Sequence, residues 1–314
     1  MFRVFVDGSS GTAGLRILDR LEARRDLELI RLPEESRRDP EARKEAMNRA
    51  DAVFFCLPDE AAREAAAWVE NPETVLIDTS TAHRVCEAWT YGFPEIHGLR
   101  EKIRSGRRIA NPGCHASGFL ALAAPLTEEG ALSPEERLTC FSLTGYSGGG
   151  KKMIAEYEDP GRDALLEAPR QYGLAQRHKH LPEMKKYGGL TFEPVFCPVV
   201  APYYAGMEVT LPLHGSQLKI PAGRLKELYR DYYAGSRLIH VAEETDEAGF
   251  CSAGRFAGRD DLEIQVAGNE DRVLLIARFD NLGKGASGAA IQNLNLRMGV
   301  PEETGLVFEE GGKA

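Results

Sequence analysis

Near its N-terminus the chain reads Arg3-Val-Phe-Val-Asp-Gly8-Ser-Ser-Gly11-Thr-Ala-Gly14, a short apolar run followed at once by three glycines spaced three apart. The apolar run predicts a buried strand, and Leu15, Leu18 and Leu21 continue at helical spacing. A strand, a glycine-rich turn and a helix in this order are typical of the first unit of a doubly wound fold. Small residues in such a turn let the backbone approach a pyrophosphate at the helix N-terminus.

The same alternation continues through the first third of the chain. Apolar and polar runs predict strands at 27–32, 51–57 and 74–77 and helices at 40–50 and 60–69. The third strand is nearly all apolar in its middle, as parallel strands buried on both faces are. We therefore predict an α/β fold with a Rossmann-like, doubly wound parallel sheet and a dinucleotide site at the Gly8 turn. Glycine-rich turns also occur without a ligand, and the turn alone leaves that alternative open.

The pattern changes after Asn111-Pro-Gly113. A helical stretch at 114–126 precedes longer strand-like runs at 138–143, 191–200, 206–213, 262–267 and 272–279. This order predicts a second, α+β domain on a mixed or antiparallel sheet. A last helical segment at 283–298 is expected to return to the first domain. The predicted domains are therefore 1–113, completed by 283–314, and 114–282.

The composition is that of an ordinary globular protein, with a formal net charge of -9, 43% hydrophobic residues and 28% charged residues. The acidic balance argues against a nucleic-acid partner, because phosphate backbones need clustered Lys and Arg. No apolar run approaches the ~20 residues of a membrane span, and no signal-peptide pattern is present, so we expect a cytoplasmic protein and no membrane partner. The six cysteines are scattered without metal-ligand spacing, and we expect no metal.

The end of the predicted second strand selects between dinucleotide cofactors, because it lies beside the adenosine ribose. The sequence there reads Glu34-Glu35-Ser36-Arg37-Arg38. Two guanidinium groups could hold a 2′-phosphate in bidentate fashion, which favours NADP. The alternative is a solvated loop in which the arginines pair with the neighbouring carboxylates.

Asn111-Pro-Gly-Cys114 is the sharpest local motif. The Pro-Gly pair predicts a tight turn out of a strand, and Cys114 then begins an apolar helix. A thiol near a helix N-terminus has its pKa lowered from about 8.5, because the helix dipole favours the thiolate. Cys114 is therefore the candidate nucleophile. A buried core cysteine is the commoner case, but it fits the cysteines of the apolar strands better.

A cysteine nucleophile needs a base, and seven histidines are available. The segment His178-Lys-His180-Leu-Pro-Glu183 combines two imidazoles with a carboxylate that could orient one of them, as the third group of a catalytic triad does. A His-x-His pair is also a common surface feature or adventitious metal site, and spacing alone leaves this open. His115 adjoins Cys114, but neighbours on a helix do not face one another, and we assign it no role.

Three further loops carry small or polar residues where a ligand would bind. Ser80 and Arg84 follow the fourth strand and would suit a phosphate, although an ordinary turn with a helix cap is equally consistent. Gly148 and Gly149 suggest close approach of a flat group such as nicotinamide, or alternatively a flexible hairpin. Asp280-Asn-Leu-Gly-Lys-Gly285 opens the last helix with small residues that suit either cofactor contact or tight helix packing.

Taken together, these motifs resemble the N-acetyl-γ-glutamyl-phosphate reductases of arginine biosynthesis, in particular their shorter, type 2 form. The matching blocks, in order, are the Gly8 loop, Ile77–Arg84, Tyr91-Gly-Phe-Pro-Glu95, Asn111-Pro-Gly-Cys114, and Asp280–Gly285 with Gln292-Asn293. The resemblance covers essentially the whole chain, and the larger superfamily includes aspartate-semialdehyde dehydrogenase. One departure is the run Thr-Ser-Thr-Ala-His-Arg84 in place of the Ser-Ala-Asp-Phe-Arg style of the longer form.

The resemblance implies an N-terminal nicotinamide-binding domain, a C-terminal catalytic and oligomerisation domain, NADP as cofactor, and a homo-oligomer, dimer or tetramer. It implies Cys114 as nucleophile and His180 as acid/base, supported by His178, Glu183 and Tyr172. The expected cofactor-binding residues are Gly8, Ser10, Gly11, Thr12, Ala13, Gly14, Ser36, Arg37, Arg38, Leu57, Pro58, Ser80, Gly148, Gly149, Asn281 and Gly285. The expected substrate-binding residues are Arg84 and Asn111.

The implied reaction is the NADPH-dependent reduction of an acyl phosphate, N-acetyl-γ-glutamyl phosphate, to N-acetylglutamate 5-semialdehyde. A Cys114 thiolate would displace phosphate to leave a thioester, and hydride transfer would give a thiohemiacetal that His180 helps to collapse. Another phosphorylating semialdehyde dehydrogenase, such as aspartate-semialdehyde dehydrogenase, would use the same groups. A dinucleotide-binding sensor or structural subunit without turnover would bind the cofactor but would not need a reactive thiol.

Overall fold

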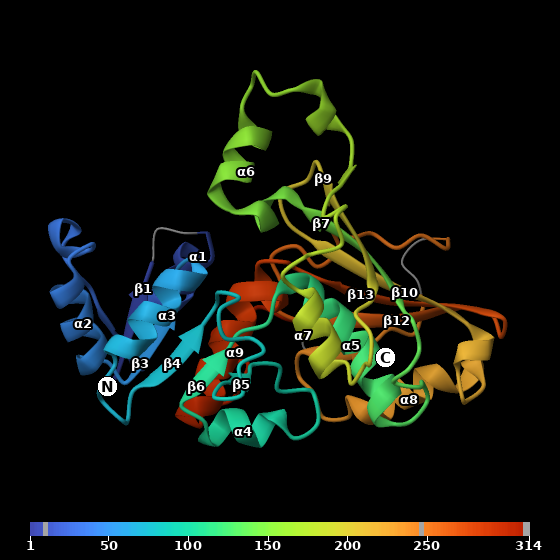
Figure 1. Cartoon of the computed structure of the whole chain (residues 1–314), viewed down its shortest axis with the longest axis horizontal. Coiled ribbons are helices and arrows are strands. Elements are labelled where there is room, and N and C mark those ends of the chain that lie inside the picture. The colour runs from blue at the N-terminus through green and yellow to red at the C-terminus, as the bar shows by residue number, and fades with distance from the viewer. Residues whose placement is uncertain (9–11, 245–247, 310–314) are drawn as a thin grey trace. The chain divides into compact units, whose positions relative to one another are not determined.

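The computed structural model describes residues 1–8, 12–244 and 248–309. The chain divides into two compact units (Figure 1). Unit 1 consists of Met1–Pro112 and Ala286–Leu306, and unit 2 consists of Gly113–Gly285 and the residues from Val307 onward. The chain therefore passes into unit 2 just before Cys114 and returns to unit 1 just after Gly285.

Unit 1 is built on a parallel sheet which, within the described ranges, has six strands in the order β2-β1-β3-β4-β6-β5. The strands are β1 (Phe2–Asp7), β2 (Leu27–Ile30), β3 (Ala52–Phe55), β4 (Val75–Asp78), β5 (Thr90–Tyr91) and β6 (Arg108–Ala110). Val4 of β1 pairs with Leu29 on one side and with Ala52 on the other. The strand order thus reverses at β1, and ligands of such sheets bind beyond the carboxyl ends of the strands at this point.

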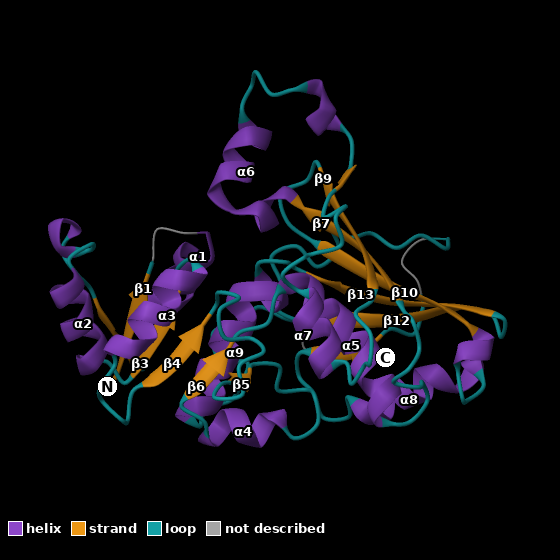
Figure 2. Ribbon diagram, viewed as in Figure 1, coloured by secondary structure: helices purple, strands orange, loops and turns teal. Residues whose placement is uncertain are grey.

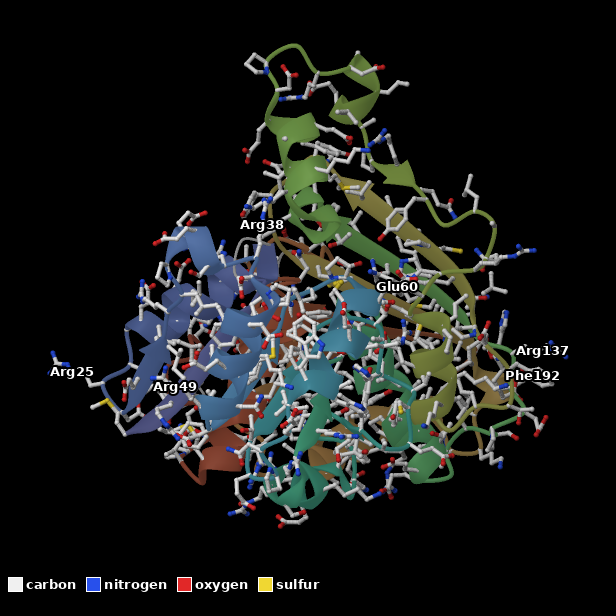
Figure 3. All side chains as sticks on the ribbon, turned by 60° about the vertical axis from the view of Figure 1, so that its left-hand side comes forward. Arg25, Arg38, Arg49, Glu60, Arg137 and Phe192 are labelled. Carbon is white, nitrogen blue, oxygen red and sulfur yellow. The ribbon has the colours of Figure 1, made fainter. Side chains whose placement is uncertain are left out.

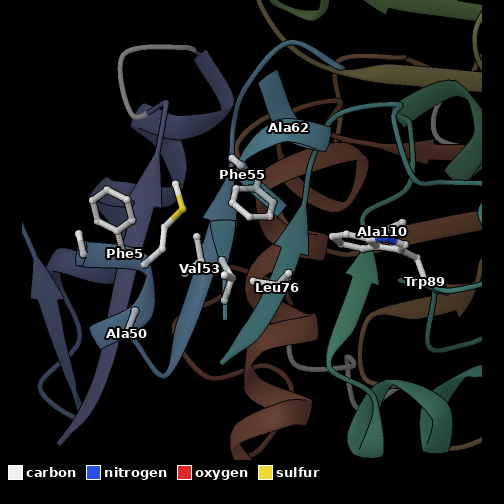
Figure 4. Packing of buried hydrophobic residues seen from close by; sticks show 12 residues of the cluster. Phe5, Ala50, Val53, Phe55, Ala62, Leu76, Trp89 and Ala110 are labelled. Carbon is white, nitrogen blue, oxygen red and sulfur yellow. The ribbon is translucent and has the colours of Figure 1, made fainter. Parts of the chain in front are cut away.

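Helices form two groups against this sheet. They are α1 (Thr12–Glu22), α2 (Pro40–Arg49), α3 (Asp59–Trp68), α4 (Leu99–Ser105) and α9 (Gly288–Met298). Helix α2 packs against α3, whereas α9 packs against α1 and α4. Phe5, Phe55 and Leu76 lie in one apolar cluster with Met47 and Ala62 of α2 and α3 (Figure 4). Because alternate side chains of a strand face opposite ways, the strands are buried on both faces, and the predicted α/β fold is confirmed.

Unit 2 is built on a mixed sheet, which in the part of the chain that is described has the order β11-β12-β13-β10-β7-β9-β8. The strands are β7 (Thr139–Gly145), β8 (Arg170–Gln171), β9 (Val195–Ala201), β10 (Met207–His214), β11 (Ile239–Val241), β12 (Leu262–Gly268) and β13 (Arg272–Phe279). The pairs β7–β9 and β11–β12 are parallel, and the central pairs β7–β10, β10–β13 and β12–β13 are antiparallel (Figure 2). The predicted α+β domain is confirmed.

The helices of unit 2 position the candidate nucleophile. They are α5 (Cys114–Glu128), α6 (Gly150–Glu158), α7 (Leu181–Tyr187) and α8 (Leu225–Tyr232). Helix α5 is buried along almost its whole length, and it packs against β10 and β13 on one side and against α7 and α8 on the other. Ser142 of β7 pairs with Val209 of β10, and both are buried on the face that α5 covers. None of the helices in the described ranges is long and apolar enough to cross a membrane.

The opposite face of the unit 2 sheet carries apolar side chains in the open. Phe141, Val195 and Leu274 are 43%, 56% and 44% exposed. Register places the three on one face, because paired residues and residues two apart in a strand share a face. Val195 pairs with Thr139, two residues from Phe141. Phe141 pairs with Thr210, two residues from Pro212, which pairs with Leu274. An apolar sheet face of this kind is typical of an interaction surface rather than of a surface that faces water.

Candidate active site

Cys114 is the first residue of α5, and the turn that precedes it fixes its position. Gly113 is the residue before the helix, and its N–H donates to Oε2 of Glu183 at 3.1 Å. Cys114 itself is half-buried. A Cβ on Gly285 would lie 2.9 Å from the Cβ of Cys114, so the backbone of Gly285 passes directly against the cysteine. Only glycine leaves room for the thiol here.

The predicted histidine segment lies at the start of α7, in the same unit. His180 is the residue before the helix and Glu183 lies in its first turn, both buried. Nε2 of His180 is 4.0 Å from Oε1 of Glu183, while the other oxygen of Glu183 holds Gly113. The rings of His178 and His180 meet edge to face, with centroids 4.6 Å apart. Glu183 therefore connects the candidate acid/base to the start of the cysteine helix.

His115 belongs to the same cluster, although no role was expected for it. Its ring centroid lies 5.6 Å from that of His178 and 5.4 Å from that of His180. It is hydrogen-bonded through Nε2 to the hydroxyl of Tyr172 at 2.6 Å. Cys114 and His115, as neighbours on a helix, indeed do not face one another. The side chain of His115 instead faces other elements of unit 2. The sequence feature that could have identified His115 is that it is the single imidazole in a mostly apolar helix.

Burial sets the charge of several groups in unit 2. Burial lowers the pKa of His115 to about 3, and positive charge at His178 or Lys179 adds to this effect, so the imidazole of His115 is neutral. Burial also raises the pKa of Tyr172, as does the negative charge of a thiolate at Cys114, so the phenol stays protonated. In the described residues, no group of three or more His, Cys, Asp and Glu side chains could hold a metal ion.

Two other thiols have surroundings unsuited to a nucleophile. Burial raises the pKa of Cys56 to about 12 and that of Cys140 further still. Both thiols are therefore protonated at neutral pH, and only the thiolate is nucleophilic. Neither lies at the start of a helix, since Cys56 follows β3 and Cys140 is inside β7.

The glycine-rich turn of unit 1 is described in part. Gly8 follows β1 with φ of +82°, and a Cβ there would overlap the backbone oxygen of Cys56, so only glycine fits. Ser10 and Gly11 lie outside the described residues. Thr12 and Ala13 begin α1, although their side chains lie outside the description, and Gly14 is buried in the same helix.

The neighbouring strand ends supply the other expected cofactor contacts in unit 1. Leu57 and Pro58 follow β3, and Pro58 is the residue before α3. Ser80 follows β4, where its N–H and hydroxyl donate to the buried carboxylate of Asp78 at 2.9 and 2.8 Å. These residues lie at the carboxyl edge of the sheet, the edge at which ligands of such folds bind.

The Ser36-Arg37-Arg38 run lies in a short turn after β2. Ser36 ends a 3₁₀-helix, and Nη1 of Arg37 is 2.7 Å from a carboxylate oxygen of Glu34. Arg38 is exposed (Figure 3). The sequence did not single out Arg43 of α2, whose guanidinium donates to both carboxylate oxygens of Asp7 at 3.1 and 2.8 Å at the end of β1.

Arg84 and Asn111, the expected substrate ligands, are buried in unit 1. Arg84 donates from Nε to the carbonyl of Asn111 at 2.9 Å and from Nη2 to the carbonyl of Thr79 at 3.2 Å. Asn111 donates from Nδ2 to the carbonyl of Ala286 at 3.0 Å. These hydrogen bonds hold together the loops that follow β4 and β6.

Gly148 and Gly149 are exposed and end a 3₁₀-helix that leads directly into α6. The alternative of a flexible hairpin at these glycines is therefore wrong, because Gly150, with φ of +73°, turns the chain into a helix. Asn281 anchors this loop: its Nδ2 donates to Oγ of Ser147 at 2.9 Å, and its Oδ1 accepts from the N–H of Gly206 at 3.0 Å.

Two protein-family models match the chain. The model described as semialdehyde dehydrogenase, NAD binding domain, matches residues 3–105. The model described as semialdehyde dehydrogenase, dimerisation domain, matches residues 114–281. The boundary between the two matches falls at the turn before Cys114.

Curated relatives are similar to the chain over nearly its whole length. N-acetyl-gamma-glutamyl-phosphate reductase 2 of Nostoc sp. is 40% identical, covering 97% of this chain and 99% of the relative. N-acetyl-gamma-glutamyl-phosphate reductase of Sinorhizobium medicae is 43% identical, covering 94% and 98%. N-acetyl-gamma-glutamyl-phosphate reductase 2 of Pseudomonas putida is 41% identical, covering 96% and 98%.

Solved structures share the fold. Aspartate semialdehyde dehydrogenase II of Vibrio cholerae matches with a TM-score of 0.72 at 18% identity, covering 95% of this chain and 98% of that one. Aspartate semialdehyde dehydrogenase of Francisella tularensis matches with a TM-score of 0.70 at 15% identity, covering 94% and 99%. At these identities the likeness shows the common architecture.

The low pKa of His115 predicts a pH dependence of stability. Its folded-state pKa of about 3 lies below the ordinary value of 6.5, so the stability from its neutral form is complete above pH 6.5 and is lost as the pH falls toward 3. In His115→Phe no group titrates at this position, so the free energy of unfolding lacks this pH-dependent contribution. Between pH 7 and pH 5, the difference in unfolding free energy between parent and variant should shrink by about 2 kcal/mol.

Urea unfolding of both proteins at the two pH values measures this change. Tyr229→Phe is the matched control, because it removes a buried hydrogen bond from Tyr229 to the carbonyl of Leu122 without removing a group that titrates in this range. Its difference from the parent should be the same at both pH values. A constant difference for His115→Phe as well would show that His115 is not held neutral by burial.

Proposed function

This chain belongs to the N-acetyl-γ-glutamyl-phosphate reductases of the semialdehyde dehydrogenase family, and on that premise we propose that it reduces N-acetyl-γ-glutamyl phosphate to N-acetylglutamate 5-semialdehyde with NADPH, as a step of arginine biosynthesis. The family makes the chain an oxidoreductase with an NAD(P)-binding domain. The similarity to the curated reductases supports the substrate, and the observation that carries the proposed chemistry is the cluster of Cys114, His180 and Glu183 around the start of α5.

Cys114 is the nucleophile of the proposed reaction. Its thiolate attacks the carbonyl carbon of the acyl phosphate, the C–O bond to phosphate breaks, and a thioester on the sulfur remains. Because Glu183 accepts from the N–H of Gly113, the first turn of α5 is held in one orientation. The N-terminus of a helix carries backbone donors and the positive end of the helix dipole, and this turn is the proposed stabiliser of the oxyanion of the tetrahedral intermediate.

His180 is the acid/base of the second half of the reaction. When bound, NADPH supplies hydride to the thioester carbon. His180, which holds the proton of the Cys114 thiol, gives that proton to the oxyanion left after hydride addition and takes it back as the C–S bond breaks, so that the aldehyde leaves and the thiolate of Cys114 returns. Glu183, 4.0 Å from Nε2 of His180, stabilises the imidazolium that forms, and His178 supports the ring of His180 from its edge.

Unit 1, completed by α9, is the proposed dinucleotide-binding domain. A pyrophosphate is expected at the turn after β1, because Gly8 has a φ of +82° that favours glycine and the turn lies where the strand order reverses, before α1. Ser36, Arg37 and Arg38 are the proposed contacts to the 2′-phosphate of NADP. Binding requires Arg37 to exchange its ion pair with Glu34 for the phosphate. Gly148, Gly149 and Gly285 of unit 2 are the proposed contacts to the nicotinamide.

Unit 2 is the proposed catalytic and oligomerisation domain. Its open sheet face, with Phe141, Val195 and Leu274 exposed, would be covered by the same face of a second copy, giving a homo-oligomer. The cysteines of the described residues form no disulfide, and we propose a reducing, cytoplasmic compartment.

A substrate panel tests the proposed function in the oxidative direction. The enzyme should reduce NADP⁺ with N-acetylglutamate 5-semialdehyde and phosphate, with kcat/KM about 100-fold or more above that for aspartate 4-semialdehyde, because the shorter aldehyde lacks a methylene and carries an unblocked ammonium. Leaving out phosphate should abolish steady turnover, since phosphate releases the acyl group from Cys114. A preference for aspartate 4-semialdehyde would make the chain an aspartate-semialdehyde dehydrogenase, and cofactor binding without turnover would make it a sensor.

The cofactor preference is tested by changing Arg37 and Arg38 to Ala together. Charge-assisted hydrogen bonds to a phosphate contribute about 1.5–3 kcal/mol each, although exposure reduces this. The double variant should therefore lose about ten-fold or more in kcat/KM with NADPH and keep its value with NADH. Arg49→Ala is the control, because Arg49 is an exposed arginine at the far end of α2 (Figure 3). An unchanged cofactor ratio in the double variant would mean that these arginines do not read the 2′-phosphate.

A further inference from the structure

Two sequence blocks that match the family have no role in the proposed reaction, and unit 1 brings them together. They are residues 91–95, which begin in β5, and residues 292–293, which lie in α9. Asn293 is fully buried, and its Nδ2 donates to the carbonyl oxygen of Gly92 at 3.0 Å. A Cβ on Gly92 would lie 2.4 Å from that nitrogen, so the contact leaves no room for a side chain at position 92.

The same amide nitrogen reaches an expected substrate ligand. An amide NH₂ group carries two hydrogens, and Nδ2 of Asn293 donates the second one to Oδ1 of Asn111 at 3.2 Å. Asn111 is buried and lies three residues before Cys114 in the sequence. Asn293 therefore contacts the residue that follows β6 and begins the turn toward the nucleophile.

The other end of the Asn293 amide shows that its orientation is imposed by these two contacts. Oδ1 of Asn293 is buried and has no hydrogen-bond partner among the residues that the structure describes, which costs free energy. Rotating the amide by half a turn would be worse, because it would place that oxygen against two other acceptors, the carbonyl of Gly92 and Oδ1 of Asn111. The arrangement thus leaves a buried acceptor unsatisfied and keeps a donor on Asn111.

A fixed Asn293 in turn fixes the amide of Asn111. Because Oδ1 of Asn111 accepts from Asn293, its Nδ2 lies on the other side, where it donates to the carbonyl of Ala286 at 3.0 Å. The backbone of Asn111 is also occupied, since its N–H donates to the carbonyl of Asp78 at 2.7 Å and its carbonyl accepts from Arg84. In the described part of the chain, the second N–H of the Asn111 amide is the one group of this residue left for a ligand.

We propose that Asn293 is a positioning residue, which turns the amide of Asn111 so that an N–H, and not the carbonyl oxygen, faces the phosphoryl oxygens of the substrate. The inference rests on the proposed function in one respect, the assignment of Asn111 as a substrate ligand. An N–H donated to a phosphate oxygen is a charge-assisted hydrogen bond, whereas an amide oxygen in its place repels the phosphate. Arg84, the other expected ligand of the phosphate, is hydrogen-bonded to the same residue.

The test measures KM for inorganic phosphate and KM for NADP⁺ in the oxidative direction. Asn293→Asp keeps the shape of the side chain but replaces the donor Nδ2 with an acceptor oxygen. The amide of Asn111 then turns to donate to it and presents its own oxygen to the phosphate. KM for phosphate should rise about ten-fold or more, as loss of one hydrogen bond to a charged group requires, and KM for NADP⁺ should change less than about two-fold.

A double-mutant cycle shows whether Asn293 acts through Asn111. Asn111→Ala should itself raise KM for phosphate. In that background, Asn293→Asp should raise it no further, because the amide that Asn293 orients is gone. A further, additive rise would overturn the proposal, as would an unchanged KM for phosphate in Asn293→Asp alone.

Asn295→Asp is the matched control for a lost pair of buried hydrogen bonds in α9. Asn295 is also fully buried, and its Nδ2 donates to the carbonyls of Glu302 and Thr304 at 2.9 Å each. The substitution should lower Tm and leave KM for phosphate in place. An equal rise in KM for phosphate would show that any disturbance of α9 has this effect, and it would overturn the role of Asn293.

A second variant disturbs the same contact from the opposite side. Gly92→Ala places a methyl group against Nδ2 of Asn293, so it should raise KM for phosphate in the same direction while KM for NADP⁺ stays nearly constant. If Asn293→Asp does not fold, an unchanged KM for phosphate in Gly92→Ala overturns the proposal.

The phosphate readout separates this inference from the proposed function, because it can be made with whichever semialdehyde the enzyme oxidises. A raised KM for phosphate in Asn293→Asp together with a preference for aspartate 4-semialdehyde would support the role of Asn293 and contradict the substrate. Activity on N-acetylglutamate 5-semialdehyde with an unchanged KM for phosphate would support the substrate and contradict the role of Asn293. If no semialdehyde is oxidised, calorimetric titration with inorganic phosphate gives Kd instead, and an equal Kd for parent and Asn293→Asp overturns the inference.

Discussion

The carboxylate of Glu183 ties two helix starts to each other. One oxygen accepts the N–H of Gly113, immediately before Cys114, and the other faces Nε2 of His180. Glu183 is buried, and a buried carboxylate must be compensated by the groups around it. Removing the Glu183 side chain would therefore take a hydrogen bond from the turn before Cys114 and a carboxylate from beside His180 at the same time.

Other contacts in unit 2 also hold the start of α5 in place. Helix α5 lies against β10 and β13 and against α7, so the thiol is carried by rigid elements rather than by a loop. The backbone of Gly285 passes against Cys114, and His115 reaches back to Ser142 of β7. The start of α5 is thereby fixed from the sheet, from α7 and from the segment that leads into the last helix, as a site that must hold reacting atoms in one geometry requires.

Much of the fold, and the place of Cys114 in the candidate site, could be predicted from local sequence patterns. The other contacts of the site join residues far apart in the sequence. Alternating apolar runs and the Gly8 turn predict the unit 1 fold because period and turn chemistry are local properties. The Pro-Gly turn predicts Cys114 at a helix start for the same reason. The partners of His115 lie 27 and 57 residues away, and no local pattern shows them. Arg84 stays a predicted phosphate ligand, and no local pattern showed that its guanidinium donates to the backbone carbonyls of Asn111 and Thr79.

If Cys114 is the nucleophile, the acyl group of the substrate passes through its sulfur and can be trapped there. The protein is mixed with N-acetyl-γ-glutamyl phosphate without NADPH, quenched with acid and digested, and its peptides are examined by mass spectrometry. We expect an N-acetylglutamyl thioester on the peptide that contains Cys114, which disappears on adding NADPH. We also expect Cys114→Ser to bind NADPH but neither to trap the acyl group nor to turn over. An acyl group on another cysteine, or turnover by Cys114→Ser, would contradict the role of Cys114 as nucleophile.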